Sequence, residues 1–412
     1  MNPVYTVFVY IVWFLATFFM TTLLLMLLLT KNKLYETKKS KLKRKPLVSI
    51  VVPAYNEEGS IANTICSLKR VNYPKLEFII VNDGSKDRTS SIVRKEISDD
   101  ERFVFIDRKR NKGKAASLNE GIRKARGELI ATIDADSEVE PEIINKVLPY
   151  FNSEKVGAVT VSVEVNKPKG FLHRIIDLEY VLGLSLFLKV LSIVNCIYVT
   201  PGPCSIYKAS ALRKIKGFDE NNITEDFEIA FRLRKAGYRI TNCIEAKVCT
   251  KVPPTFKQVY VQRRRWYTGT LQTIIKHRDM ILNKKYGIFA YFLPLNYSLI
   301  LLGLALFIYT TYLGFSNILE NILYFRYTNF NFLDRLFDWQ FDYLAYNDLS
   351  LFGILGFLTT IVVMLIGLKI ARKSYKEKKW GMLGYPCLYF LYQIFWISAI
   401  INVIKGGKIK WK

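Results

Sequence analysis

Residues 76–83 have the sequence Leu-Glu-Phe-Ile-Ile-Val-Asn-Asp, an apolar run that ends in polar side chains. Similar short runs lie at 48–53, 103–106, 129–133 and 156–163. Such runs of β-branched and aromatic residues are typical of strands buried in a parallel sheet. Helix-like segments separate them at 59–70, 88–97, 114–125 and 142–151. The alternation predicts a doubly wound α/β domain.

Polar residues follow three of these predicted strands at the point where each strand ends. They are Tyr55 to Glu57, Asp83 and the pair Asp134-Ala-Asp136. Asp83-Gly84 alone would also suit a tight turn, and the two aspartates alone would suit helix caps. Because ligands of such sheets bind beyond the carboxyl ends of the strands, their shared edge favours a binding site. One aspartate of the pair can hold a phosphate-bound Mg²⁺ or Mn²⁺ ion while the other contacts a nucleotide.

Long apolar segments flank the predicted domain. Residues 4–30 carry no charge and exceed the ~20 residues that cross a bilayer, and further segments lie at about 288–313, 349–368 and 383–404. Basic clusters at 31–45 and 369–379 follow the positive-inside pattern, which predicts a cytoplasmic central domain and an N-terminus outside. The basic residues 405–412 conflict with four spans, because alternation would place them outside.

The formal net charge of +25 therefore belongs mainly to membrane edges, and nucleic-acid binding is not predicted. The six cysteines and two histidines show no metal-site spacing, and a reducing cytoplasm suits the central domain. We expect the segments 171–195 and 256–283 to be amphipathic helices at the membrane interface; buried core helices are the alternative. The expected organisation is a span at 1–30, a basic linker at 31–47, a catalytic domain at 48–285 and a membrane region with about three spans at 286–412.

Two more clusters complete a recognisable pattern. Thr224-Glu225-Asp226 opens a helix-like stretch, and Gln262-Arg-Arg-Arg-Trp266 follows it. Together with Asp83 and Asp134-Ala-Asp136, these clusters resemble the D, DxD, (T)ED and QxxRW motifs of membrane-embedded processive glycosyltransferases of family 2. Cellulose, chitin and hyaluronan synthases belong to that group. The resemblance implies a nucleotide-sugar-binding domain of GT-A type joined to an α-helical transmembrane bundle.

The resemblance also implies a role for each motif. Asp226 would be the catalytic base, and Asp136 would ligate Mg²⁺ or Mn²⁺ on the diphosphate of the donor. Acceptor contacts are expected from Glu225, Gln262 and Trp266. Nucleotide-sugar contacts are expected from Tyr55, Glu57, Asp83, Lys114, Asp134 and Arg265. Glu225 and Glu228 remain alternatives for the base, Arg263 and Arg264 remain alternatives for the phosphate contact, and the three acidic residues would also suit a plain helix N-terminus.

A single N-terminal span and a small membrane bundle are similar to family members that polymerise N-acetylglucosamine. That likeness implies UDP-N-acetylglucosamine as donor and a β-linked, β-1,6 exopolysaccharide of biofilms as product. It also implies a growing chain exported across the plasma membrane, and a small membrane accessory protein. Two alternatives stay open: transfer of one sugar to a polyprenyl phosphate, and a non-catalytic membrane glycan-binding subunit.

Overall fold

The computed structural model describes residues 3–34, 45–327 and 348–406. They fall into two compact units, each described here by itself. The larger unit comprises Leu29–Phe292 and Ile366–Lys412, and the smaller comprises Met1–Leu28 and Leu293–Leu365. The predicted catalytic domain at 48–285 therefore lies wholly within the larger unit.

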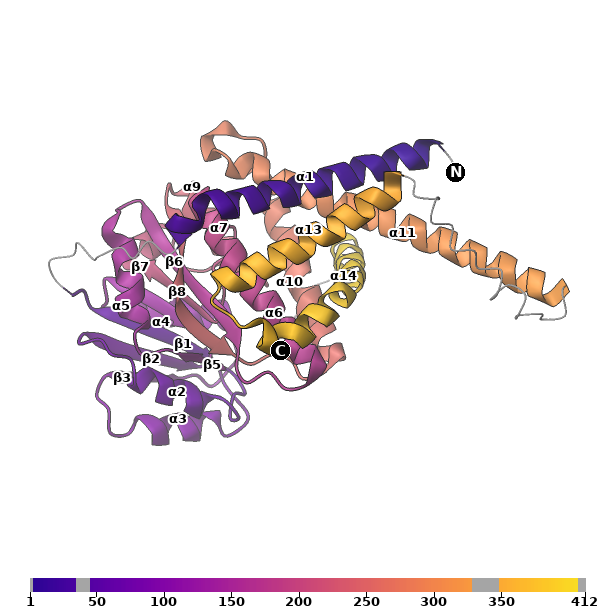
Figure 1. The fold of residues 1–412 in the computed structure, drawn as a ribbon. Coiled ribbons are helices and arrows are strands. Elements are labelled where there is room, and N and C mark those ends of the chain that lie inside the picture. The colour runs from indigo at the N-terminus through magenta and orange to yellow at the C-terminus, as the bar shows by residue number, and fades with distance from the viewer. Residues whose placement is uncertain (1–2, 35–44, 328–347, 407–412) are drawn as a thin grey trace. The chain divides into compact units, whose positions relative to one another are not determined.

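The larger unit is built on an eight-stranded sheet with the strand order β3-β2-β1-β4-β7-β6-β8-β5 (Figure 1). The first four strands in that order are parallel, β7 is antiparallel to both its neighbours, β8 is parallel to β6, and β5 is antiparallel to β8. The strands are β1 Val48–Ala54, β2 Leu76–Asn82, β3 Phe103–Asp107, β4 Leu129–Ile133, β5 Ser137–Val139, β6 Val156–Val165, β7 Cys204–Lys208 and β8 Arg239–Thr250.

The α/β fold class is confirmed, and the five predicted strands correspond to β1, β2, β3, β4 and β6. The sheet is mixed because three strands that were not predicted, β5, β7 and β8, extend it beyond β4. β5 and β7 are short, and β8 is interrupted by charged residues, so none has a clear apolar run. The predicted helices correspond to α2 Ile61–Lys69, α3 Thr89–Ile97, α4 Lys114–Lys124 and α5 Ile143–Val147 with the 3₁₀ turn Leu148–Asn152.

Alternate residues of β1 face opposite sides of the sheet, as a strand requires. Ile50 and Val52 belong to the core shared with α2 and α3, which lie together on one face (Figure 1). Val51 faces α4, where Gly121 permits close contact because a Cβ at that position would collide with the Val51 side chain. Helices on both faces thus bury the strands and leave the strand ends to form a site.

A second group of helices in the larger unit covers the β6–β8 side of the sheet. α6 buries Ile175, Ile176 and Leu178 while Phe171 at its start is exposed. The segments expected to be amphipathic are helical: α6 Gly170–Tyr180, the π-helix η2 Val181–Phe187 and α7 Leu188–Ile193, and then α10 Phe256–Lys276 with the 3₁₀ turns Arg278–Met280 and Lys284–Tyr286. Helices α8 Ala209–Lys214 and α9 Glu225–Lys235 lie between β7 and β8 in the chain.

Helix α14, Tyr375–Ile404, packs on both α6 and α10 within the same unit. Lys378 forms a buried ion pair with Asp177 of α6. Further along, Trp396 stacks on Tyr267 of α10 with ring centroids 4.3 Å apart. The larger unit therefore includes a helix from the far end of the chain.

The described chain has two helices that are long and apolar enough to cross a membrane, at Thr6–Thr30 and Phe289–Leu313. They belong to α1 Pro3–Leu34 and α11 Phe289–Tyr327 and match two of the four expected spans. A third is possible if the two halves of α14, bent by 47°, form one span. The apolar part of α13 Asp348–Ile370 is the shorter stretch Ile354–Ile370. Most of the basic linker at 31–47 and of the tail at 405–412 lies outside the described residues.

Candidate active site

The DxD aspartates lie at the end of β4, as the sequence predicted. Asp134 forms an ion pair with Lys114, whose Nζ atom lies 2.6 Å from Asp134 Oδ1. Asp136 Oδ1 accepts hydrogen bonds from Ser137 Oγ at 3.1 Å and from Thr250 Oγ1, at the end of β8, at 3.3 Å. Burial, and then the negative charges of Asp134 and Glu57, raise the pKa of Asp136 to about 7. The site therefore has a surplus of negative charge that a cation would relieve.

The segment after β1 contributes Glu57 to this acidic group. Asn56 adopts a left-handed backbone conformation, with φ of 55°, and turns the chain sharply after Tyr55. The Glu57 backbone N–H donates to Thr89 Oγ1 at 2.8 Å, and its carboxylate accepts a short hydrogen bond from Ser60. Burial raises the pKa of Glu57, and Asp134 adds to the increase. Tyr55 is half-buried beside this turn.

Asp83, at the end of β2, holds a neighbouring loop. It is 2% exposed, and its oxygens accept from Arg108 Nη1 at 2.9 Å, from the Lys112 N–H at 3.0 Å and from the Gly113 N–H at 2.8 Å. Gly84 lets the loop approach, because a Cβ there would collide with the backbone between residues 110 and 111. Asp83 thus positions the segment that leads into Lys114; a direct contact with the nucleotide remains a prediction.

The start of α9 places two carboxylates opposite the DxD pair. Glu225 Oε1 is 3.0 Å from Lys114 Nζ, so the lysine bridges Asp134 and Glu225. Burial opposes ionisation of Glu225, but Lys114 and then Arg265 outweigh it and lower the pKa. For Asp226, burial and then Glu225 raise the pKa to about 7. Of the two, Asp226 is therefore the one poised to take up a proton near neutral pH.

A loop before β7 fixes the backbone of Asp226. Both the N–H and the hydroxyl of Thr200 donate to the Asp226 carbonyl, at 3.0 and 2.9 Å, and the Tyr207 hydroxyl donates to Thr200 Oγ1 at 2.9 Å. Gly202 in the same loop lies directly against the Lys114–Asp134 pair, which leaves no room for a side chain. Thr200 and Tyr207 were not predicted from the sequence, because the contacts that link them to Asp226 have no local sequence signal.

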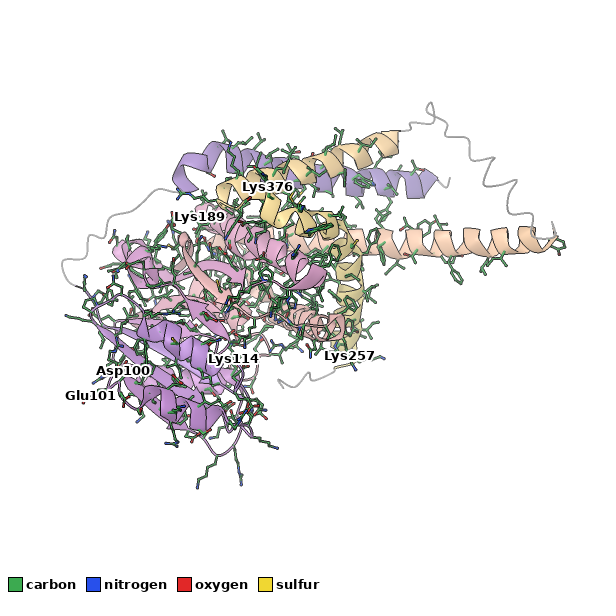
Figure 2. All side chains as sticks on the ribbon, turned by 60° about the horizontal axis from the view of Figure 1, so that its bottom comes forward. Asp100, Glu101, Lys114, Lys189, Lys257 and Lys376 are labelled. Carbon is green, nitrogen blue, oxygen red and sulfur yellow. The ribbon has the colours of Figure 1, made fainter. Side chains whose placement is uncertain are left out.

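These groups surround a small cavity of about 10 Å³, roughly the space of one water molecule. Figure 2 labels Lys114, which pairs with both Asp134 and Glu225. The cavity therefore brings together two motifs that are far apart in sequence. Its lining residues are Lys114, Leu118, Thr132, Asp134, Thr200, Gly202, Tyr207, Phe218, Glu225 and Asp226.

The QxxRW motif lies in the middle of α10. Gly269, one turn further on, allows α10 to contact Thr224, because a Cβ at Gly269 would overlap the threonine side chain. The charge of Arg265 acts on the carboxyl groups of Glu225 and Asp226. The Gln262 Oε1 atom is buried without a hydrogen-bond partner among the described residues, and Trp266 is half-buried against the core. An interior glycine is the signal that could have marked the helix contact.

Glu228, an alternative for the base, lies away from the cavity. Its carboxylate is fully buried and pairs with Arg232, Lys276 and His277, with Arg232 Nε 2.6 Å from Oε2. Burial acts against its charge, but the hydrogen bond from His277 and the cations lower its pKa to about 2. These contacts indicate a structural role.

The described residues contain no group of three His, Cys, Asp or Glu side chains arranged to hold a metal ion on their own. Asp136 and Asp134 still fit a divalent ion that also binds substrate phosphates, because Mg²⁺ usually uses one or two protein carboxylates. The raised pKa of Asp136, with Asp134 and Glu57 close by, supports that fit.

Comparison with known proteins identifies the class. Residues 49–216 match the family model described as glycosyl transferase family 2. The chain thus carries a domain of that family, and it is a glycosyltransferase.

Individual proteins of known name are also similar to this chain. The poly-beta-1,6-N-acetyl-D-glucosamine synthase of Staphylococcus epidermidis is 27% identical over 381 residues, which cover 88% of this chain and 86% of the relative. The protein of the same name from Staphylococcus aureus strain MW2 is 29% identical over 230 residues, or 56% of each chain. In fold, the chain is similar to the mannosyltransferase PcManGT from Pyrobaculum calidifontis in complex with GDP-Man and Mn²⁺, with a TM-score of 0.63, 18% identity, and coverage of 97% of this chain and 99% of that one.

Proposed function

We propose that this protein polymerises N-acetylglucosamine from UDP-N-acetylglucosamine into a β-linked, β-1,6 polysaccharide. The observation that carries the proposal is one cavity lined by the donor-side Asp134 and the base candidate Asp226. The name shared by the staphylococcal relatives supports the sugar and the linkage. The reaction is a single displacement in which a hydroxyl group of the acceptor attacks the anomeric carbon of the donor.

Asp226 acts as the base in this step. The new bond forms between the acceptor oxygen and the anomeric carbon, the bond from that carbon to the diphosphate breaks, and its electron pair leaves with UDP. The hydroxyl proton passes to an Asp226 carboxylate oxygen. A base with a pKa near 7 is matched to neutral pH. Because the nucleophile enters opposite the leaving group, an α-linked donor gives a β-linked product.

The donor is held by residues from the sheet edge and from α10. Asp83, Tyr55 and Glu57 bind the nucleotide side, and Asp134 binds the nucleotide sugar. Lys114 and Arg265 are the cations that face the diphosphate. When the donor binds, Lys114 gives up part of its ion pairing with Asp134 and Glu225 and contacts the phosphates instead. The donor must therefore compete with an ion pair already present in the site.

Asp136 is the residue that would hold a divalent ion, with Asp134 beside it. When bound, Mg²⁺ or Mn²⁺ supplies a Lewis acid that stabilises charge on the departing diphosphate. The complex of PcManGT with Mn²⁺ supports a divalent ion in this fold.

The acceptor sugar binds on the α10 side of the cavity. Gln262 Oε1, which has no hydrogen-bond partner within the described part of the chain, can accept from a sugar hydroxyl. Trp266 offers an aromatic face to the ring, and Glu225 orients the attacking end. We also propose that the protein is a multi-pass plasma membrane enzyme with a cytoplasmic catalytic domain and an outside N-terminus. Processive export of the chain, aid from a small membrane accessory protein and a role in biofilm complete the proposal.

The length of the product tests this function. Membranes that contain the protein are incubated with labelled UDP-N-acetylglucosamine and Mg²⁺, and the products are separated by size. We expect a polymer that is degraded by a β-1,6-N-acetylglucosaminidase. A single labelled sugar on a lipid would contradict polymerisation and favour the polyprenyl-phosphate alternative, and no incorporation from any UDP-sugar would favour the glycan-binding alternative.

A further inference from the structure

The three consecutive arginines of the QxxRW motif have different surroundings on α10. Arg263 is buried, at 3% exposed, and its Nη2 atom donates to Glu179 Oε2 of α6 at 2.8 Å. Arg264 lies with its guanidinium carbon 5.6 Å from the Tyr260 ring. Arg265 acts on the active-site carboxylates Glu225 and Asp226. Arg265 therefore serves the active-site carboxylates, whereas Arg263 binds α6.

Arg263 also covers one face of the motif tryptophan. Its guanidinium carbon lies 4.2 Å from the centroid of the Trp266 ring and 5.8 Å from that of Tyr180. A guanidinium group at that distance interacts favourably with the indole π face and occupies it. A sugar ring can then stack only on the opposite face of Trp266.

Glu179 and Arg263 form a pair withdrawn from water. Their side chains are 16% and 4% exposed. Burial acts against the charge of Arg263, but Glu179 outweighs it and raises the pKa of the guanidinium group above its usual range. The hydroxyl groups of Tyr180, Tyr267 and Tyr392 lie within electrostatic range of the guanidinium group. The hydrogen bond between the two buried side chains limits the positions that the Arg263 guanidinium group can take. Removal of either partner would leave an unpaired charge among aromatic rings, which is costly.

We propose that Glu179 and Arg263 are positioning residues that fix the plane of Trp266 and direct the acceptor sugar onto the face that Arg263 does not cover. The inference rests on the proposed role of Trp266 in acceptor binding. Neither residue lines the cavity that holds Asp134 and Asp226. Donor binding and activation should therefore persist when the pair is altered, while binding of the acceptor should weaken.

Two rates measured on the full-length protein in detergent separate these effects. One is transfer to a soluble N-acetylglucosamine oligosaccharide at varied concentration, and the other is slow UDP release with water as acceptor. In Glu179→Gln and Arg263→Lys we expect the acceptor KM to rise about tenfold. Loss of one stacking or cation–π contact costs about 1.4 kcal/mol, which corresponds to a tenfold change in affinity. UDP release without acceptor should stay within about twofold of wild type. Lys257→Gln, which removes an exposed cation from the same helix (labelled in Figure 2), should change neither rate.

A double variant distinguishes positioning from folding. Arg263→Met with Glu179→Gln removes both charges of the pair, so its thermal stability should recover relative to the single variants, while its acceptor KM should stay high. An acceptor KM that returns to wild type in the double variant, or a UDP release that falls in step with transfer, would overturn the positioning role.

The Trp266→Ala variant shows which assignment has failed. If Trp266→Ala raises the acceptor KM and the pair variants do not, only the inference about the pair is wrong. If Trp266→Ala also leaves the acceptor KM unchanged, the acceptor role proposed for Trp266 is wrong, and the inference falls with it.

Discussion

Lys114 and Asp134 form an ion pair with 2.6 Å between Nζ and Oδ1, and the same ammonium group lies 3.0 Å from Glu225. One lysine thus balances a carboxylate from the DxD motif and a carboxylate from the TED motif. The charge of Lys114 also lowers the pKa of Asp226, against burial and Glu225. Binding of the donor diphosphate to Lys114 would therefore change the ionisation of the base.

Lys114→Gln should weaken donor binding and shift the pH profile. With the lysine charge removed, the pKa of Asp226 rises further, so the rise of activity with pH should move to higher pH. We expect the donor KM to increase about tenfold or more, because a charge-assisted contact to phosphate is lost. Initial rates over a pH series test both effects, and Lys257→Gln serves as a control for the loss of a cation. An unchanged profile would contradict the coupling of Lys114 to Asp226.

The wild-type enzyme should become more active as pH rises through about 7. Asp226 must be ionised to accept a proton, and its pKa is raised to about 7 by burial and Glu225. This increase with pH should be seen in kcat/KM for the acceptor, which reports the ionisation of the enzyme before the acceptor binds. Saturating metal removes any contribution from Asp136. A flat profile between about pH 5 and 8, a range that spans the reference pKa values of carboxyl and imidazole groups, would argue against Asp226 as the base.

Asp226→Asn should stabilise the protein at alkaline pH. A carboxyl whose pKa is raised in the folded state contributes stability below its unfolded pKa, and loses that contribution as pH rises through its folded pKa. At pH above about 7 the wild type therefore carries an unfavourable buried charge that asparagine lacks. We expect Tm to rise by about 2–4 °C above pH 7 and to differ less near the unfolded pKa. Thermal unfolding in detergent at both pH values provides the measurement, and a lower Tm for the variant at alkaline pH would count against the burial argument.

Gly269→Val should separate α10 from α9 and reduce transfer. A side chain at Gly269 overlaps Thr224, which precedes the base on α9. We expect a loss of activity of about 100-fold, the scale of a misplacement of about 1 Å in an active site. Gly59→Ala is the matched control, because a Cβ at Gly59 meets nothing within 4 Å. Full activity of Gly269→Val would show that this contact does not position the site.

Glu228→Gln should lower stability rather than remove the base. The variant leaves the partly exposed Arg232 and Lys276 without their carboxylate partner, which costs about 1–3 kcal/mol in the free energy of unfolding. The pKa of Glu228 is lowered to about 2, so its contribution is present above the unfolded pKa and is lost as pH falls through about 2. Denaturation measured with urea tests this. Wild-type stability with lost catalysis would reverse the assignments of Glu228 and Asp226.

The sequence predicted the positions of the motifs better than their partners. Asp83 and Asp134 end apolar runs, so their place at the edge of the sheet followed from strand order. The pairing of Lys114 with Glu225 did not, because it joins α4 to α9 through a tertiary contact with no local signal. Thr200 and Tyr207 were not predicted for the same reason. β8 was missed because charged residues interrupt its apolar pattern.

In the proposed reaction, Asp226 removes the proton of the acceptor hydroxyl while the edge of the sheet holds the donor. The most direct measurement compares wild type with Asp226→Asn for UDP affinity and for incorporation of labelled sugar from UDP-N-acetylglucosamine. We expect the variant to bind UDP with the wild-type Kd and to incorporate no sugar into polymer. Incorporation by Asp226→Asn at the wild-type rate would show that Asp226 is not the base.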